Sequence, residues 1–348
     1  MSRLNNIHSK NNYLEEKVPK VTVIIVNWNR KNYLTLCLQS LRKQTYRDFE
    51  VLVVDNGSTD GSVSVVRSMF PEVRVIPLDR NYGFAAANNI GLNMARGDYI
   101  ALLNNDAQAT PNWLEELVRA IEAHPEVGFC ASRILLLEYP NLVDACGDFY
   151  TRDGFAGKRG HLNHSFMYEH YEYVFGACGA AVLYRKKMLE EIGFFDEDFF
   201  LAHEDTDLSF RAQLAGYKCL YVPTAVVYHH LSATIGRDSD MYIYYGHRNI
   251  EYVFLKNMPT CLLYKSLPAH LLMNIFLLIF YLTRGQACPF LRAKVDVIRN
   301  LPLMLRKRKV VQKYRKSSLS YISSLLEESW FKQALRKKVS NWLKILYE

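Results

Sequence analysis

The 348-residue chain is 49% hydrophobic, 22% charged and 13% aromatic, which excludes a disordered protein and suffices for one large domain with an appendage. Its seven cysteines form no C-x-x-C pair and residues 1–20 are polar, so we expect reduced thiols in a cytosolic protein without a secretory signal. The net charge of +8 is uneven: residues 284–348 hold 16 Lys and Arg against 4 Asp and Glu, whereas residues 1–283 hold 27 against 31. We therefore predict that the basic C-terminal part meets an anionic surface.

Strands and helices are predicted to alternate from residue 21 onward. Apolar runs indicate buried strands at 21–26, 49–54, 73–78, 99–103 and 127–135. Apolar residues at helical spacing, or small residues, indicate helices within 34–41, 63–69, 83–95 and 111–124. This alternation is typical of βαβ units with right-handed crossovers, so we predict an α/β, Rossmann-like, mostly parallel sheet flanked by helices.

The second half of the chain is less regular. Residues 138–175 are rich in Tyr, His and Gly and are interpreted as loops over the site. Regular patterning returns at 176–185, followed by helices near 186–192 and 204–215 and a strand at 219–228.

Three polar clusters directly follow predicted strands. They are Asn27-Trp28-Asn29, the stretch from Asp55 to Asp60, and Asn104-Asn105-Asp106. Ligands of such sheets bind beyond the carboxyl ends of the strands, so the three clusters are expected to meet at one rim. Neither a G-x-G dinucleotide fingerprint nor a P-loop is present, so a bound phosphate is expected to be held by a cation.

Two sets of residues could carry chemistry at that rim. Asn104 and Asp106 offer oxygen ligands to Mg²⁺ or Mn²⁺, although an Asn/Asp turn capping a strand is the alternative. Residues 203–207 hold three acids at a predicted helix start, where they could cap the helix or supply a general base. Asp207 and Arg211, four apart, predict a surface ion pair.

Histidines and aromatic residues give weaker signals. His229 or His230, after a strand, could provide a third metal ligand, although a single histidine is usually structural. Trp28 and Tyr33 could stack on a nucleotide base or pack in the core.

Five segments in order resemble the family 2 inverting glycosyltransferases, and within that family the bacterial rhamnosyltransferase-like branch that builds cell-surface polysaccharides. They are VTVIIVNWNR, VVDNGSTDGS, NYGFAAANNIG, LLNNDA and the run from GACGAAVLYRKK to RAQLAGYK, within residues 20–258. The resemblance implies the GT-A fold. It also implies a nucleotide-sugar-binding half at 21–135 and an acceptor and catalytic half at 136–258.

The resemblance implies roles for the residues that match the family's motifs. The residues implied to bind the nucleotide sugar are Asn27, Trp28, Asp55, Asn81, Gly83, Asn89, Asn105 and Arg248, the last in an Arg248-Asn249 pair near the diphosphate. The implied metal ligands are Asn104, Asp106 and His229, and the acceptor-side residues are Gly179 and Asp196. Asp205 matches the catalytic base, and Glu204 beside it would orient the acceptor or the base.

Two residues depart from the family's pattern. Asn104 replaces an acid at the metal site, which should weaken metal affinity, and Asn88 stands where many relatives have Arg. One contact to the donor phosphate is therefore expected to be missing.

The implied function is transfer of a sugar, with rhamnose favoured, from a dTDP- or UDP-sugar to a hydroxyl of a cell-surface glycan or lipid-linked acceptor, assisted by Mg²⁺ or Mn²⁺. The alternative is a catalytically inactive nucleotide-sugar-binding or scaffold subunit of a glycan assembly complex. A nucleotidyltransferase is disfavoured because its glycine-rich N-terminal loop is absent.

Residues 259–348 are predicted to form a helical, basic extension. The apolar run from 271 to 282 is shorter than the roughly 20 residues that span a bilayer, so a core helix and an in-plane membrane helix remain open. The basic run at 306–309 favours peripheral attachment to the anionic cytoplasmic face of the cell membrane. Nucleic acid is not an expected partner.

Overall fold

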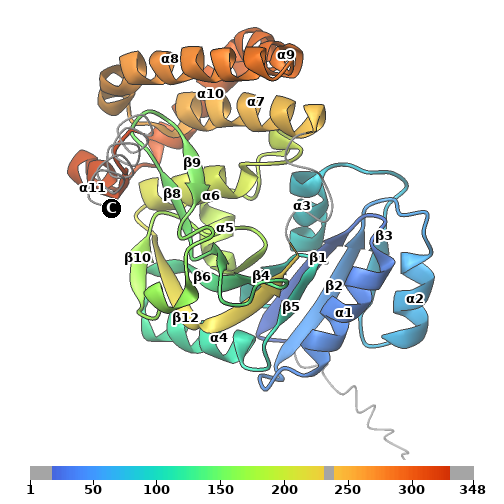
Figure 1. Cartoon of the computed structure of the whole chain (residues 1–348). Helices are drawn as coiled ribbons and strands as arrows, with labels where there is room; N and C mark the ends of the chain where they lie inside the picture. Colours follow the sequence, from blue (N-terminus) through green and yellow to red (C-terminus); the bar gives the residue numbers. More distant parts are fainter. Residues whose placement is uncertain (1–17, 231–238, 330–348) are drawn as a thin grey trace, which may run out of the picture.

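The computed structural model describes residues 18–230 and 239–329. The expectations for the polar N-terminal segment, except residues 18–20, and for the end of the basic extension lie outside the described residues. At the centre of the molecule is a 10-stranded mixed sheet with helices on both faces, and further helices stack above it (Figure 1).

The first half of the chain builds four parallel strands joined by helices. The strands lie in the order β4-β1-β2-β3. They are β1 (Val21–Asn27), β2 (Phe49–Asp55), β3 (Arg74–Pro77) and β4 (Tyr99–Leu103). The intervening helices are α1 (Lys31–Arg42), α2 (Ser62–Met69) and α3 (Phe84–Met94). The β-branched run of β1 is buried on both faces of the sheet, which is why the sequence reads as continuously apolar there.

The second half extends the same sheet in mixed orientation. β11 (Ala181–Arg185) lies antiparallel between β4 and β6 (Val127–Leu136), and β12 (Lys218–His229) runs parallel to β6. The remaining strands of the sheet are β5 (Ala107–Ala109), β7 (Val143–Ala145) and β10 (Glu172–Val174). The expected fold class, a mixed and mostly parallel sheet flanked by helices, is confirmed.

The interpretation of residues 138–175 as loops is partly wrong. This stretch contains β7, the hairpin of β8 (Asp148–Tyr150) and β9 (Ala156–Lys158), a 3₁₀ turn at Ser165–Met167, and β10. Each strand has three residues, too few for an alternating pattern to emerge from the sequence.

Hydrophobic cores form on both faces of the sheet. One core lies under α1, α2 and α4 (Trp113–Ala123), and the other under α3, α5 (Lys186–Ile192) and α6 (Glu204–Leu214). All seven cysteines fall within the described residues and are free thiols, as expected.

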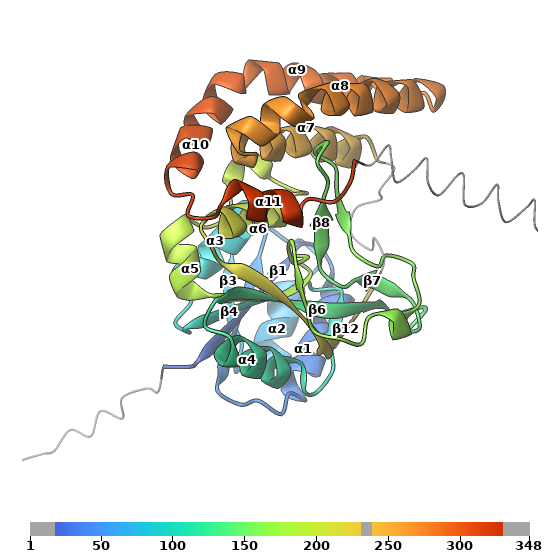
Figure 2. The same ribbon diagram turned by 90° about the vertical axis from the view of Figure 1, so that its left-hand side faces the viewer.

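A helical layer covers one end of the sheet (Figures 1 and 2). Its members are α7 (Asp240–Asn257), α8 (Thr260–Thr283), α9 (Ala287–Arg299), α10 (Leu301–Lys313) and α11 (Leu319–Leu325). They share a third core with the rest of the molecule, in which Phe254 of α7 joins Tyr150 of β8 and Phe210 of α6. The helical layer is therefore packed onto β8 and α6 through buried apolar contacts.

Helix α8 is longer and more exposed than the sequence suggested. It begins at Thr260, includes Pro268 and has 24 residues, so by length and composition it could cross a membrane. Only His270 and Met273 are buried, and the core-helix alternative is wrong. Pro268 and His270 interrupt the apolar pattern in the sequence, so the predicted run begins later than the observed helix.

The basic run on α10 is only partly exposed. Lys307 pairs with Asp196 and Asp198, and Arg308 donates to the carbonyl oxygens of Leu255 and Met258. Arg306 and Lys309 remain on the exposed surface.

Candidate active site

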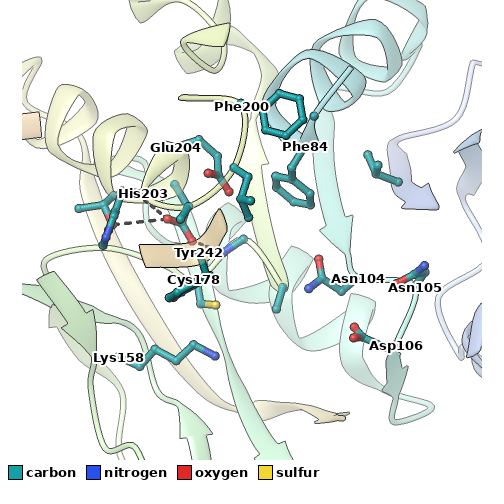
Figure 3. Close-up of a pocket in the computed structure, with 18 of the residues that line it drawn as sticks. Phe84, Asn104, Asn105, Asp106, Lys158, Cys178, Phe200, His203, Glu204 and Tyr242 are labelled. Carbon is teal, nitrogen blue, oxygen red and sulfur yellow. Dashed lines mark hydrogen bonds between the residues drawn. The ribbon is translucent and has the colours of Figure 1, made fainter. Parts of the chain in front are cut away.

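A cavity of about 410 Å³ opens at the carboxyl ends of the central strands (Figure 3). It is lined by residues from both halves of the sheet, from hairpin β8–β9 and from the start of α6. Those used below are Trp28, Asn56, Asn81, Gly83, Asn104, Asn105, Asp106, Asp148, Lys158, Gly179, His203, Glu204, Asp205 and His229. The expectation that the three polar clusters meet at one rim is thereby confirmed.

Asn27 and Asp55 tie the strand ends together behind the cavity wall. Parallel pairing places them side by side, and the Asn27 Nδ2 donates to Asp55 Oδ2 at 3.0 Å. The Oδ1 of Asn27 accepts from Nδ2 of Asn105 at 2.8 Å. Both residues are buried and neither lines the cavity; in the structure they support its wall, and their contact with the nucleotide stays a prediction.

Asn56, which the sequence interpretation did not single out, stabilises the neighbouring part of the cavity wall. Its Nδ2 donates to Asn81 Oδ1 at 2.9 Å, and its Oδ1 accepts from the backbone of Tyr82 at 2.9 Å. Gly83 follows with φ +88°, where an added Cβ would lie 2.5 Å from the ring of Phe200. Only glycine fits this close approach without displacing the segment before α6.

Asp106 and His229 form the polar end of the cavity. β4 ends just before Asp106 and β12 ends at His229. The Nε2 of His229 lies 3.1 Å from Asp106 Oδ1, and its Nδ1 lies 2.9 Å from Oδ2 of Asp144. Two strand ends and β7 thus place an imidazole between two carboxylates.

The charged side chains at this end of the cavity shift one another's pKa values. Burial alone would lower the pKa of His229, but hydrogen bonds to Asp106 and Asp144 raise it to about 9. Burial alone would raise the pKa of Asp144, but His161, His229 and Lys158 hold it well below its usual range. The pair His229–Asp144 therefore matches the carboxylate-supported histidine found at metal sites.

The chemistry of these donors fits a divalent ion. The 3.1 Å between His229 Nε2 and Asp106 Oδ1 is close to the ~3 Å that separates neighbouring ligands of an octahedral ion with bonds of ~2.1 Å. An ion there would replace the proton on Nε2. Within residues 18–230 and 239–329, no group of three His, Cys, Asp or Glu side chains is arranged to hold a metal alone. Phosphate oxygens and water would have to complete the shell.

His229, not His230, faces the cavity. His230 turns to the other side, where its Nδ1 contacts Glu138 and its ring meets Tyr33 edge-on at 4.7 Å between centroids. Tyr33 does not line the cavity, whereas Trp28 lines it and is 38% exposed. Of these two aromatic residues, Trp28 is therefore the one available to a base.

Asp205 lies on the cavity wall contributed by the start of α6. Its Oδ2 accepts from the backbone N–H of Gly179 at 2.9 Å, and its Oδ1 from that of Thr206 at 2.7 Å. These two bonds fix the carboxylate orientation, and no cation pairs with it among the described contacts. A carboxylate held in this way can accept a proton from a bound hydroxyl.

Glu204 is buried beside Asp205 in a strained segment. The preceding Phe200, Ala202 and His203 all have positive φ, between 58° and 67°. The Oε2 of Glu204 has no hydrogen-bond partner, and burial, followed by the charge of Asp205, raises the pKa of Glu204 to about 8. Glu204 is therefore a neutral acid beside a carboxylate at neutral pH.

Comparison with known proteins identifies the family. The family model "Glycosyl transferase family 2" matches residues 22–193. The uncharacterized glycosyltransferase YwdF of Bacillus subtilis is 30% identical over 64% of this chain and 78% of its own length. The chain belongs to glycosyl transferase family 2.

Other relatives of this family 2 glycosyltransferase differ in length. The N-acetylglucosaminyl-diphospho-decaprenol L-rhamnosyltransferase of Mycobacterium tuberculosis is 29% identical over 67% of this chain and 83% of its own length. The chain spans only 26% and 18% of two longer relatives, the uncharacterized protein y4gI of Sinorhizobium fredii and the O-antigen biosynthesis protein RfbC of Myxococcus xanthus. Each of these is 30% identical, over 64% of this chain.

Solved structures share the fold. GalNAc-T7 with UDP, GalNAc and Mn²⁺ aligns with a TM-score of 0.57 at 17% identity, covering 70% of this chain and 48% of that one. The mannosyltransferase PcManGT of Pyrobaculum calidifontis, with GDP-Man and Mn²⁺, aligns with a TM-score of 0.51 at 19% identity, covering 88% and 78%. The GT-A fold is confirmed.

Besides Asn27 and Asp55, three more residues that the resemblance assigned to the site of this glycosyltransferase do not line its cavity. The amide of Asn89 bonds the backbone of Phe195, which ties α3 to the segment before α6. Asp196 is a half-buried partner of Lys256 and Lys307. In the structure both hold structural contacts, and their roles toward donor and acceptor stay predictions.

The third is Arg248, which together with Asn249 supports the strained segment before α6; its expected contact with the diphosphate stays a prediction. Arg248 donates to the carbonyl oxygen of Asp198 and to Asn249 Oδ1. The Nδ2 of Asn249 lies 2.7–2.8 Å from the carbonyl oxygens of Phe199, Leu201 and Ala202. This buried amide holds the turn that delivers Glu204 and Asp205 to the cavity.

Other differences concern residues near the site. Asn88 donates to the carbonyl oxygen of Phe84 inside α3, away from the cavity. Asp207 and Arg211 do pair, at 2.8 Å, but the pair is buried and not on the surface as expected.

Sequence reasoning missed Asp144, Asp148 and Lys158. All three lie in the short strands of residues 138–175, and Asp148 and Lys158 line the cavity. The only signal was that acidic and basic side chains alternate with glycines in a stretch predicted to cover the site.

Proposed function

We propose that this chain is an inverting glycosyltransferase that moves a sugar from a nucleoside diphosphate to an acceptor hydroxyl. One observation carries the proposal: Asp106 with His229, and Asp205, line the same cavity of about 410 Å³. A cavity of this size is in the range of small-ligand sites. It offers a metal and diphosphate end and a carboxylate that can accept a proton.

The reaction follows from these positions. Asp205 accepts the proton of the acceptor hydroxyl, and the oxygen forms a bond to the anomeric carbon. The bond from that carbon to the diphosphate breaks at the opposite face, and the electron pair leaves with the diphosphate. A single displacement inverts the configuration. The N–H groups of Gly179 and Thr206 keep the base oriented throughout.

Asp106 and His229, with Asn104 beside them, would hold Mg²⁺ or Mn²⁺. The ion, when bound, supplies neutralisation of the charge that grows on the leaving diphosphate. Because Asn104 brings no charge, we expect weaker metal binding than at a site with two acids. Solved structures of the same fold with Mn²⁺ support this assignment.

The donor and the acceptor are inferred from the names of similar proteins. The relative named a decaprenyl-diphosphate-linked rhamnosyltransferase favours a rhamnose donor and a lipid-linked acceptor, and the relative named for O-antigen biosynthesis favours a cell-surface glycan. dTDP and UDP are both compatible with a cavity in which Trp28 is the exposed aromatic residue.

We further propose attachment to the cytoplasmic face of the membrane through α8. Its exposed apolar side chains include Leu271, Leu272, Ile275, Phe276, Ile279, Phe280 and Leu282. In Figures 1 and 2 the helix lies on the outer side of α7, away from the sheet. Exposed Arg306 and Lys309 on α10 add charge that attracts anionic lipid.

The test is incubation with Mn²⁺ or Mg²⁺, a lipid-diphosphate acceptor and a panel of dTDP-, UDP- and GDP-sugars. Transfer, or slow donor hydrolysis, with one sugar supports the enzyme. Tight donor binding with neither transfer nor hydrolysis, across the whole panel, would support the inactive donor-binding subunit instead.

A further inference from the structure

Lysine and arginine are scarce among the described residues that line the cavity. Asp106, Asp148, Glu204 and Asp205 line it, whereas Lys158 is the one Lys or Arg among the described lining residues. The diphosphate of a sugar nucleotide is also anionic, so bringing it here requires compensating positive charge. A metal ion can supply part of that charge, and Lys158 can supply another part from the protein.

The β8–β9 hairpin delivers this lysine. Asp148 and Lys158 are directly opposite each other in the antiparallel pair, so both side chains lie on the same face of the hairpin. That face forms one wall of the cavity, together with Ala156 and Gly157. Figure 3 shows the Lys158 side chain reaching from the hairpin toward the interior. Burial, followed by the charge of Asp205, raises the pKa of Asp148 well above its usual range.

A buried carboxylate fixes the position of the ammonium. Lys158 Nζ donates to Asp144 Oδ2 at 2.7 Å, and Asp144 is fully buried. The same oxygen lies 2.9 Å from Nδ1 of His229, whose Nε2 contacts Asp106. Lys158 is therefore joined through one atom to the residues proposed to hold the metal.

We propose that Lys158 binds the diphosphate of the sugar nucleotide, as a fixed cation beside the metal site. This inference rests on the proposed function and adds to it a residue that recognises the leaving group. The phosphate of a lipid-linked acceptor offers the same chemistry, but the link through Asp144 to His229 favours the donor. Pairing with Asp144 orients the ammonium in advance, so little side-chain entropy is lost on binding.

The test compares ligands that differ only in phosphate. Binding of UDP, dTDP and GDP, and of uridine, thymidine and guanosine, is measured by calorimetry with Mn²⁺ for the parent and K158Q. We expect K158Q to bind the preferred diphosphate about tenfold more weakly or worse, and its nucleoside within about twofold of the parent. K158R, which keeps the charge, should recover most of the affinity. K187Q, which removes an exposed lysine outside the cavity, is the matched control.

A purely structural role for Lys158 would give a different pattern. K158Q leaves Asp144 without one of its partners, so the double variant D144N/K158Q is included to remove the unpaired charge. If the double variant regained both thermal stability and diphosphate affinity, or if K158Q lost nucleoside and diphosphate binding equally, Lys158 would be structural and the proposal wrong.

Two further arms separate the remaining outcomes. Weaker binding of farnesyl diphosphate to K158Q, with diphosphate nucleotides bound as tightly as by the parent, would assign the lysine to the acceptor phosphate and overturn the donor assignment. Failure of the parent to bind any of UDP, dTDP and GDP would instead contradict the proposed function itself.

Discussion

Asp205 and Glu204 are adjacent in sequence but have opposite environments. Asp205 receives two backbone N–H groups and lines the cavity, whereas Glu204 is buried with one oxygen unpaired. Replacing Asp205 by Asn keeps the shape and removes the proton acceptor. We expect turnover to fall about 10²–10⁴-fold while the dissociation constant of the donor changes little.

Single-turnover kinetics and donor titration on D205N would check this expectation. Gln213 is buried on the same helix but outside the cavity, so Gln213→Glu serves as a control for stability only. The control for activity is Glu190→Gln, which changes an exposed acid. Full turnover by D205N with tight donor binding would show that another group takes the proton.

Glu204 gives a prediction about pH and stability. Its pKa in the folded protein is raised to about 8, so the folded state binds a proton that the unfolded chain releases near its ordinary pKa of 4.5. The stabilising contribution is complete below pH 4.5 and is lost as pH rises toward 8. Glu204→Gln stays neutral, so its melting temperature should rise relative to the parent, by about 2 °C or more, between pH 5 and pH 8.5.

Thermal melts across that pH range, with the exposed Glu190→Gln as control, measure the difference. A difference between Glu204→Gln and the parent that is constant with pH would mean that the buried acid is ionised throughout.

At the residue scale, the sequence predicted the two chemical ends of the site but not what connects them. Asp106 follows β4, His229 ends β12 and Asp205 lies at the start of α6, and all three elements have clear sequence patterns, so their place at the rim could be inferred. Asp144 and Lys158 lie in three-residue strands without periodicity, and their contacts depend on tertiary pairing. Asn89, Asp196 and Arg248 sit in matching motifs, but the motif could not distinguish a ligand contact from support of the segment before α6.

At the scale of elements, α8 carries the clearest surface prediction. Ile275→Asp with Ile279→Asp places two charges on its exposed apolar side, where both residues are more than half exposed. We expect flotation with vesicles containing anionic lipid to fall at least about tenfold, because moving a charged side chain from water into the apolar part of the bilayer interface is unfavourable.

The matched control adds the same charges at Leu36 on α1 and Met69 on α2, which are exposed but distant from α8 in sequence. Equal flotation of both variants and the parent would show that α8 is not the membrane contact. Circular dichroism melts would verify that both variants fold.

Element boundaries show where sequence patterns suffice. The strand at Tyr99–Leu103 and the helix at Lys186–Ile192 were predicted within their observed bounds, because each is a continuous apolar or amphipathic run. α8 was underestimated because Pro268 inside the helix looked like a boundary, although its neighbours continue the helix.

At the scale of the molecule, the proposed metal site joins the two halves of the sheet. Asp106 follows β4 and His229 ends β12, so an ion between them links strands far apart in the sequence. Mn²⁺ with UDP or dTDP should therefore raise the melting temperature, by about 5 °C at concentrations near 100 times the dissociation constant.

Melting curves of Asp106→Asn with and without Mn²⁺ test this link, and we expect the metal-dependent increase to be lost. Asp98→Asn, at an exposed site outside the cavity, should keep the increase. An unchanged increase in Asp106→Asn would place the ion elsewhere.

The buried ion-pair cluster around Asp207 has a mechanical consequence. Asp207 of α6 bonds Lys256 and Asn257 of α7 at 2.7 Å each, and α7 packs directly against α9 and α10. The helix that carries the base and the layer that carries α8 therefore form one stiff block. If α8 attaches to a bilayer as proposed, such a block would hold the proposed base, Asp205, at a fixed height above the lipid, and only acceptor hydroxyls at that distance from their lipid anchor would reach it.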